Sequence, residues 1–161
     1  MTVIPSSCFR RWLGADVIEI SESPIDTARL QQSLVNPAAG GYCAFEGWVR
    51  NENEGHVVER LEYEAYAPLA ITEGEKVLAE ARVKFPYLDA RCVHRVGLLE
   101  IGECAVWIGV ASAHRDEAFK ACRYIIDEIK VRLPIWKKEH YANGDSGWVN
   151  CERCAQHGIA D

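Results

Sequence analysis

The stretch SAHRDEAFKACRYIIDEIKVRLPIWKK, from Ser112 to Lys138, decides the fold of this chain. Its first part predicts a helix of about five turns, which Ser112 can cap because its side-chain oxygen accepts a hydrogen bond from a free backbone N–H group. The residue before a proline disfavours the α conformation, so the helix should end at Leu133–Pro134. We therefore expect the chain to continue beyond the proline as an extended segment, Ile135–Lys138.

The two ends of this helix carry different candidate sites. His114 and Arg115 stand at its start, where backbone N–H groups and the helix dipole attract phosphate or carboxylate groups. A solvated first turn, with Arg115 paired to a nearby acid, explains the same residues equally well. Lys130 lies near its end and Lys137 beyond the proline, and desolvated lysine amines can act in catalysis. Most such lysines are solvated surface residues, so only their convergence in space would favour a catalytic pair.

The segments before this stretch read as strands and a second long helix. Cys104–Ala113 is the most continuous apolar run in the chain and is predicted to form a central strand. Asp89–Gly97 forms another strand, separated from it by a turn at Gly102. Pro68–Phe85 predicts a helix, which the following proline ends.

Further toward the N-terminus the sequence predicts a hairpin. Gly41–Arg50 alternates as a strand, and Gly47 inside it indicates a bulge or a close backbone approach. After the polar turn NENEGH, Val57–Tyr66 is expected to be the return strand. Arg50 thus ends a strand beside a polar loop, a common place for a ligand-binding cation, although an ordinary exposed arginine fits this position as well.

The outer segments complete the predicted organisation. Asp16–Ile20 alternates as a short strand, and Ser23–Val35 predicts a helix capped by its first residue. We expect one catalytic domain at residues 16–150, an N-terminal arm at 1–15 and a polar C-terminal tail at 151–161. Because the strands and helices do not alternate strictly, an α+β fold with a mainly antiparallel sheet and packed helices is favoured.

Composition restricts the classes of partner. The 161 residues, 48% hydrophobic and 26% charged, are typical of one globular domain. A net charge of −6 argues against a general nucleic-acid binder and makes the cations at 130–138 a local exception, which favours a small anion or an acidic tail as partner. No apolar run approaches the roughly 20 residues of a membrane span. We expect a soluble, cytoplasmic protein without a nucleic-acid or membrane partner.

The seven cysteines are an odd and scattered set, which argues against a disulfide framework and favours reduced thiols. Cys151 and Cys154 with His157 suggest half of a metal site, but tetrahedral zinc needs four ligands and no second paired motif is present. A polar tail with two free thiols is the favoured interpretation. Because the sequence also lacks a P-loop, a dinucleotide fingerprint and a serine-hydrolase motif, we expect neither a cofactor nor a metal.

Five separated motifs occur in order between Tyr42 and Val149: FEGWVRNENEG, LEYEAY, HRVGLLEIGE, IGVASAHRDEAF and IKVRLPIWKKE. Together they closely resemble the MoaE family, the large catalytic subunit of molybdopterin synthase. The resemblance implies an α/β hammerhead-type fold and a sulfurtransferase that converts cyclic pyranopterin monophosphate to molybdopterin by installing a dithiolene. Sulfur would arrive as a thiocarboxylate on the C-terminal Gly-Gly of a small ubiquitin-like subunit of the MoaD type. The large subunits would form a dimer with a small subunit at each end.

The same resemblance implies the site residues. Lys130 and Lys137 match the catalytic positions. The substrate-binding positions are Arg50, His114, Arg115, Lys138 and Glu139. One departure is Trp48, which stands where many relatives carry a lysine.

Two other functions fit parts of the sequence. A cysteine-persulfide sulfurtransferase would use Cys151 or Cys154, but neither thiol has a recognisable activating loop. A non-catalytic module that binds a ubiquitin-like tail would need charge but no paired amines, so the presence of both Lys130 and Lys137 disfavours it.

Overall fold

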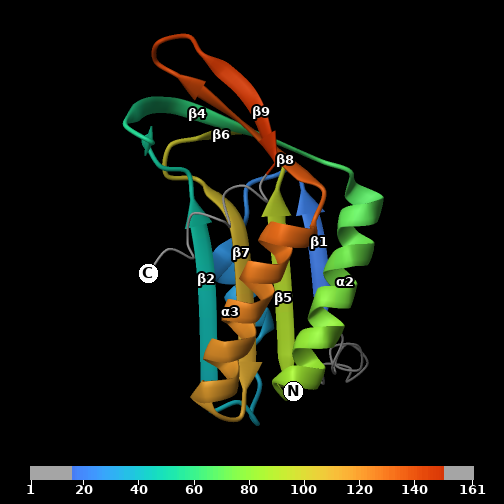
Figure 1. Ribbon diagram of the computed structural model, residues 1–161. Coiled ribbons are helices and arrows are strands. Elements are labelled where there is room, and N and C mark those ends of the chain that lie inside the picture. Colours follow the sequence, from blue (N-terminus) through green and yellow to red (C-terminus); the bar gives the residue numbers. More distant parts are fainter. Residues whose placement is uncertain (1–15, 151–161) are drawn as a thin grey trace, which may run out of the picture.

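The computed structural model describes residues 16–150, in which three helices pack against two β-sheets (Figure 1). In chain order the elements are β1 (Val17–Ser21), α1 (Thr27–Ser33), β2 (Gly41–Trp48), β3 (Glu52–Asn53), β4 (His56–Ala65), α2 (Ala67–Lys84), β5 (Asp89–Arg95), β6 (Gly97–Glu100), β7 (Cys104–Ser112), α3 (Arg115–Arg132), β8 (Ile135–Tyr141) and β9 (Ser146–Asn150). The β1–β5 pair is parallel and the other strand pairs are antiparallel. The predicted α+β class is therefore confirmed.

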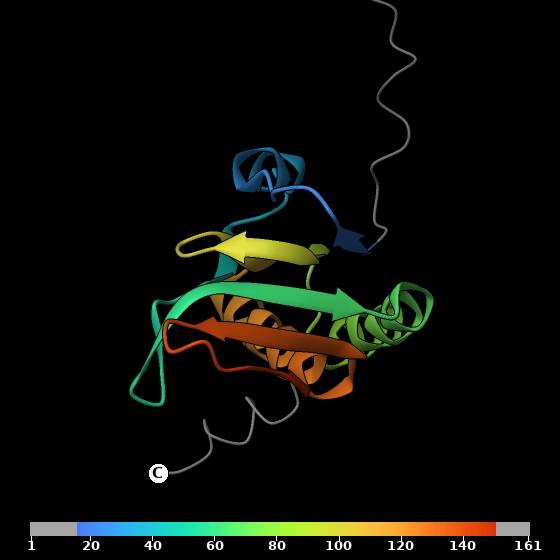
Figure 2. The same ribbon diagram turned by 90° about the horizontal axis from the view of Figure 1, so that it is seen from above.

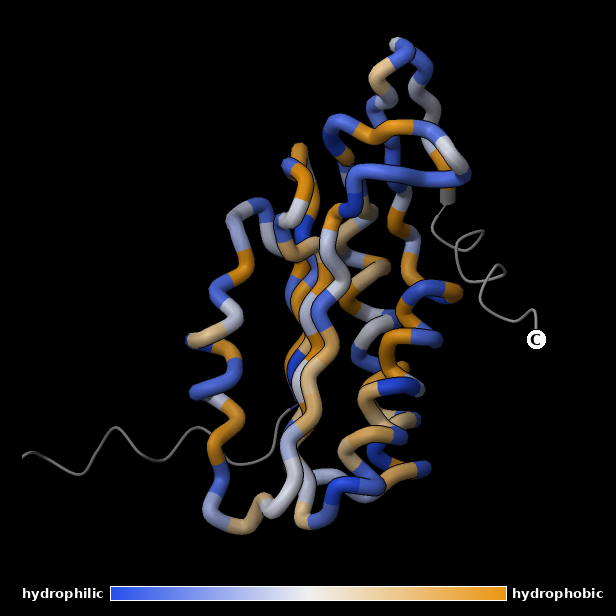
Figure 3. Tube along the Cα trace, turned by 90° about the vertical axis from the view of Figure 1, so that its left-hand side faces the viewer, coloured by the Kyte–Doolittle hydropathy of each residue, from blue (hydrophilic) through white to orange (hydrophobic). Residues whose placement is uncertain are grey.

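The first sheet has the strand order β1-β5-β7-β2. Strand β7 lies inside it, and every residue of β7 after Cys104 is buried. On one face Ile108 packs with Ile125 of α3, and on the other Trp107 packs with Leu34 at the end of α1. Figure 3 shows the same layers, with α1 on one side of the sheet and α2 and α3 on the other. The prediction that this apolar run forms a central strand is confirmed.

The second sheet has the order β3-β4-β8-β9, and β6 also pairs with β4. It lies across the end of the first sheet at which β2 and β5 finish (Figure 1). Seen from above, β4 and β8 run side by side in opposite directions (Figure 2). Because α3 leads directly into β8, the C-terminal end of this helix lies next to the second sheet.

The predicted hairpin between residues 41–50 and 57–66 is wrong. Strand β2 pairs with β7, from Gly41 opposite Ser112 to the far end of the strand, whereas β4 belongs to the second sheet. The register shifts at the predicted position, between Gly47 and Trp48, but the pairs Gly47–Val106 and Trp48–Cys104 place the extra residue, Ala105, on the partner strand β7. The irregularity interrupts the ladder next to the end of β2, after which the chain leaves the first sheet. A hairpin does exist, but it joins β4 to the two-residue strand β3.

Two helix starts also differ from the prediction. Helix α1 begins after Asp26 and not after Ser23, because the Asp26 carboxylate accepts a hydrogen bond from the Arg29 backbone N–H at 3.0 Å. At α3 the capping position is His114, whose backbone is extended. Ser112 is still part of β7, and its buried Oγ has no hydrogen-bond partner in the described part of the chain.

The end of α3 follows the prediction. Leu133 has an extended backbone, Pro134 stops the helix, and β8 begins at the next residue. Helix α2 agrees with the predicted helix to within one residue at each end. The segment predicted as a simple turn around Gly102 also contains strand β6. None of the helices between residues 16 and 150 is both long and apolar enough to cross a membrane.

Candidate active site

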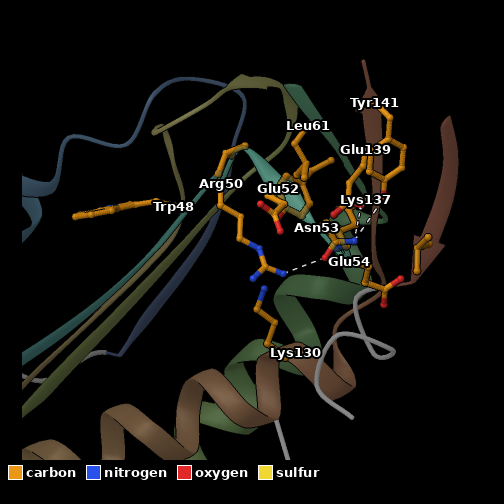
Figure 4. Close-up of a pocket in the computed structure, with 13 residues that line it drawn as sticks. Trp48, Arg50, Glu52, Asn53, Glu54, Leu61, Lys130, Lys137, Glu139 and Tyr141 are labelled. Carbon is orange, nitrogen blue, oxygen red and sulfur yellow. Dashed lines mark hydrogen bonds and ion pairs between the residues drawn. The ribbon is translucent and has the colours of Figure 1, made fainter. Parts of the chain in front are cut away.

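A cavity of about 610 Å³ lies beside the C-terminal end of α3, where the end of β2 meets the second sheet (Figure 4). Cations and carboxylates share its wall with apolar side chains, a mixture typical of ligand pockets. The lining residues are Trp48, Val49, Arg50, Glu52, Asn53, Glu54, Leu61, Tyr63, Lys130, Lys137, Glu139, Tyr141 and Val149.

The structure brings the two candidate catalytic lysines together in this cavity. Lys130 comes from the last turn of α3 and Lys137 from β8. The extended backbone at Leu133 and the hydrogen bond from the Ile135 N–H to the Leu133 carbonyl, which closes a tight turn at Pro134, direct the chain from the helix into the second sheet, so both amines face one space. The convergence that the sequence left open therefore occurs, and it favours a paired role over two solvated surface lysines.

Alternate residues of β8 face the cavity. Lys137 Nζ lies 2.9 Å from Glu139 Oε1, and the Tyr141 hydroxyl donates a hydrogen bond to the same carboxylate. Glu139 is only 8% exposed. Burial acts to raise the pKa of Glu139, but hydrogen bonds from Tyr141, Lys137 and Asn53 outweigh it, so the net pKa is lowered. Glu139 is thus ionised at neutral pH and holds Lys137 in place.

Lys138 does not reach this cavity. Successive side chains of a strand point to opposite faces, so Lys138 faces away from the cavity while its neighbours Lys137 and Glu139 line it. Its amine lies 5.6 Å from the centroid of the Trp148 ring on β9. Within one chain, strand alternation therefore separates Lys138 from Lys137 and Glu139, and its assignment to the substrate site stays a prediction.

Arg50 enters the cavity from the segment that follows β2. Its Nη2 donates a hydrogen bond to Asn53 Oδ1 at 3.0 Å. In Figure 4 the ends of the Arg50 and Lys130 side chains point toward each other. Neither forms an ion pair with a carboxylate among residues 16–150. Two positive charges therefore remain available to an anionic ligand.

His114 and Arg115 lie at the opposite end of α3. The helix has 18 residues and is roughly 27 Å long, so within one chain these two residues are far from the Lys130 end. Both are exposed, and His114 makes no side-chain capping bond. The structure therefore does not bring them to the cavity of their own chain.

Sequence reasoning missed two residues at this site. Asn53 joins Arg50 to Glu139, but an asparagine in a polar loop carries no pattern beyond its closeness to Arg50. His94 of β5 is buried, and the centroid of its ring lies 5.0 Å from the ring centroid of Tyr63, which is part of the cavity wall. Burial, and then the charge of Lys130, lower the pKa of His94 to about 4, so its imidazole is neutral. His94 belongs to the motif HRVGLLEIGE, which contributes to the family resemblance but does not indicate that this histidine is buried behind the cavity wall.

No cysteine among the described residues lines the cavity. Burial raises the pKa of Cys104 to about 11 and that of Cys122 to about 12, so both thiols stay protonated and are weak nucleophiles. Cys151, Cys154 and His157 lie outside the described residues. Within the described range, no cluster of His, Cys, Asp and Glu could hold a metal ion.

Comparison with known proteins identifies relatives along most of this chain. A molybdopterin synthase catalytic subunit from Thermoplasma volcanium is 45% identical over 131 residues, which cover 81% of this chain and 96% of the relative. A crystal structure of molybdopterin synthase from Staphylococcus aureus superposes with a TM-score of 0.77 at 36% identity, covering 86% of this chain and 97% of that one.

A second solved structure is a complex of subunits 1 and 2 of the molybdopterin-converting factor from Helicobacter pylori. It matches with a TM-score of 0.66 at 25% identity and covers 78% of this chain and 86% of that one. The family model described as MoaE protein matches residues 20–132. The resemblance seen in the sequence motifs is thus confirmed by sequence and by fold, and the chain belongs to the MoaE family.

Proposed function

We propose that this chain is the catalytic subunit of a molybdopterin synthase. It transfers sulfur from the C-terminal thiocarboxylate of a small ubiquitin-like subunit to cyclic pyranopterin monophosphate, which yields the dithiolene of molybdopterin. The observation that carries the proposal is the convergence of Lys130, Lys137 and Arg50 on one cavity. Curated relatives are named molybdopterin synthase catalytic subunits, which supports the same activity.

The charges of the cavity suit both reactants. Arg50 offers a guanidinium that can bind the substrate phosphate with charge-assisted hydrogen bonds. The thiocarboxylate is an anion, and Lys130 and Lys137 place two amines where it would arrive. Either amine can transfer a proton or accept the acyl end of the partner tail. The sulfur comes from the partner, so no thiol of this chain is required.

The partner tail enters the cavity as an extended Gly-Gly segment. Glycines have no side chains, so backbone hydrogen bonds and the terminal charge hold such a segment, while a separate surface binds the globular body. The solved complex of two molybdopterin-converting factor subunits supports a partner of this kind. A cytoplasmic location belongs to the proposal, and the free thiols of Cys43, Cys92, Cys104 and Cys122 support a reducing compartment.

A second copy of the chain would complete the site. His114 and Arg115 are at one end of α3 and Lys130 is at the other, so a two-fold pairing with antiparallel α3 helices can bring the start of one helix to the cavity of the partner. Along β2 and α3, Phe45 and Phe119 are exposed and supply apolar surface for such a contact. In this dimer His114 and Arg115 keep their predicted substrate-binding roles.

Reconstitution with purified components tests the proposal. The chain is mixed with a thiocarboxylated small subunit and cyclic pyranopterin monophosphate, and molybdopterin is measured. The matched control is the same small subunit ending in an ordinary carboxylate, which can bind but carries no sulfur. We expect product only with the thiocarboxylated small subunit and none with the carboxylate form. Tight binding of both forms without product from either would instead indicate a non-catalytic binding module.

A further inference from the structure

A single amide connects the cations on the two sides of the cavity. Asn53 Oδ1 accepts the hydrogen bond from Arg50 Nη2 at 3.0 Å. Asn53 Nδ2 donates to Glu139 Oε2 at 2.9 Å and to the Tyr141 hydroxyl at 3.3 Å. Glu139 in turn holds Lys137 at 2.9 Å. A continuous chain of hydrogen bonds therefore runs from Arg50 to Lys137 through Asn53 and Glu139.

The direction of the amide follows from the chemistry of its partners. A guanidinium can only donate hydrogen bonds and an ionised carboxylate can only accept them. The side chain between Arg50 and Glu139 must therefore offer an acceptor on one side and a donor on the other, which an asparagine does. Since the amide is neutral, it orients Arg50 without cancelling the charge of the guanidinium.

The backbone of Asn53 is fixed by the β3–β4 hairpin. Asn53 pairs with His56 across a two-residue turn in which Glu54 has a φ of 50° and Gly55 a φ of 80°. Two central residues with positive φ are characteristic of the tight type I′ turn. A hydrogen bond from the Val58 N–H to the Asn51 carbonyl closes the base of the hairpin at 2.9 Å. The amide is thus held from both its backbone and its side chain.

We propose that Asn53 is a positioning residue of the transfer reaction, which sets the orientation of Arg50 toward the phosphate and of Glu139 toward Lys137. This inference rests on the proposed function. A purely structural role, in which Asn53 only stabilises the hairpin, would tolerate either orientation of donor and acceptor. Exchange of the Asn53 donor for an acceptor separates the two possibilities.

The first measurement does not depend on activity. The side-chain carboxyl carbon of Glu139 is followed by NMR as the pH is varied, and Glu139→Gln identifies its signal. Loss of the amide donor in Asn53→Ala should raise the apparent pKa of Glu139, because one hydrogen bond to the ionised form is gone. Asn53→Asp should raise it further, since it places a second carboxylate opposite the first.

The second measurement is product formation in the complete complex with the thiocarboxylated small subunit. We expect Asn53→Asp to lower kcat at neutral pH by at least about tenfold, because small misplacements of positioning groups are that costly. The loss should shrink at lower pH, where the facing carboxyls share a proton and a donor is regained. Asn53→Ala should lose activity without this recovery.

Asn143→Asp is the matched control. Asn143 is exposed in the β8–β9 turn, and its Nδ2 donates a hydrogen bond to the Asp145 carboxylate at 3.2 Å. The substitution therefore places two carboxylates next to each other, as Asn53→Asp does, but outside the cavity. It should leave kcat and its pH dependence unchanged.

Three results would overturn the inference. One is a Glu139 titration that does not move in either Asn53 variant, because the contact would then be absent. The second is a shifted titration with kcat unchanged, because the contact would then position nothing. The third is an equal loss in both variants without recovery at low pH, as expected of hairpin stability alone. Absence of product from the unaltered complex would contradict the proposed function instead, and the titration would still test the contact.

Discussion

No carboxylate among residues 16–150 forms an ion pair with Lys130, although its amine faces the cavity. We expect Lys130→Ala to lower turnover by roughly 10²–10⁴-fold, the usual cost of removing a positioned proton-transfer group. Binding of the small subunit and thermal stability should change little. Lys120→Ala is the control on the same helix, because Lys120 is 57% exposed and pairs with Asp116 outside the cavity. Single-turnover product formation close to that of the unaltered protein would remove Lys130 from the mechanism.

His94 gives the fold a pH dependence with a definite sign. Its pKa is lowered from 6.5 to about 4, first by burial and then by the charge of Lys130. Between these values the unfolded chain binds a proton at His94 and the folded chain does not, so stability falls as the pH decreases through this window. From pH 7 to pH 4.5 the unaltered protein should lose about 2 kcal/mol more free energy of unfolding than His94→Gln does.

Urea unfolding at the two pH values measures this difference. The control is His114→Gln, since His114 is exposed at the start of α3. It should follow the unaltered protein at both pH values. If the free energy of unfolding fell by the same amount in His94→Gln and in the unaltered protein, the folded state would not keep this imidazole neutral.

Single residues show where sequence-based prediction of the site succeeds and fails. Lys130, Lys137 and Glu139 were predicted and line the cavity, because a family motif spans the whole helix-to-strand junction that places them. Asn53 was missed, since its role depends on Glu139, a partner 86 residues away. Lys138 was predicted from the same family motif as Lys137 and Glu139, and it does not line the cavity of its own chain, since neighbours in a strand face opposite sides.

The β3–β4 hairpin allows a prediction for an element as a whole. Gly55 has a φ of 80°, a region that costs an L side chain about 1 kcal/mol. Gly55→Ala should therefore lower the free energy of unfolding by about that amount, with no steric clash, because no atom lies within 4 Å of the added Cβ. The altered turn should also displace Asn53 and lower kcat.

Gly144→Ala provides the matched comparison. Gly144 has a φ of 87° in the β8–β9 turn, again with nothing within 4 Å of an added Cβ. The cost in urea unfolding should be similar, but kcat should fall less. Equal losses of kcat in the two variants would argue that the β3–β4 turn has no special connection to the site.

Elements were predictable where a local signal defines them. Pro134 stops α3 through a clash with the preceding residue, so the helix end and the strand after it followed from the sequence. Strand pairing is not local. The alternation of segment 41–50 predicts pairing with the next strand in sequence, but β2 pairs with the buried strand β7, whose residues lie 56 to 71 positions later. The alternation of side chains along this segment is compatible with either partner strand, and only the tertiary arrangement of the first sheet decides between them.

At the scale of the assembled molecule, sharing of the site between two copies predicts complementation. Arg115→Ala and Lys130→Ala should each be nearly inactive as pure dimers. Mixed dimers would carry both defects in one site and none in the other. Random pairing makes half of the dimers mixed, so co-expression should restore roughly a quarter of the activity. The measurement is product formation by co-expressed, differently tagged subunits, and no recovery above the pure variants would place the whole site in one chain.

The complex with the small subunit permits a test of how its tail is bound. One residue added after the final glycine displaces the reacting carbon by about 3.5 Å. Turnover should stop, while most of the affinity remains because the globular body is bound elsewhere. A titration and a product assay on the same extended partner measure the two effects. Full activity would mean that the tail does not end in the cavity assigned to it.

Helix α3 restricts how the length of this chain can vary. Because each added residue rotates the rest of a helix by about 100° and advances it by about 1.5 Å, an insertion between Arg115 and Lys130 would turn Lys130 relative to the start of the helix. The turn at residues 142–145 joins two strands at an exposed tip and has no such requirement. Insertions and deletions should therefore accumulate in that turn during evolution and be eliminated from the helix.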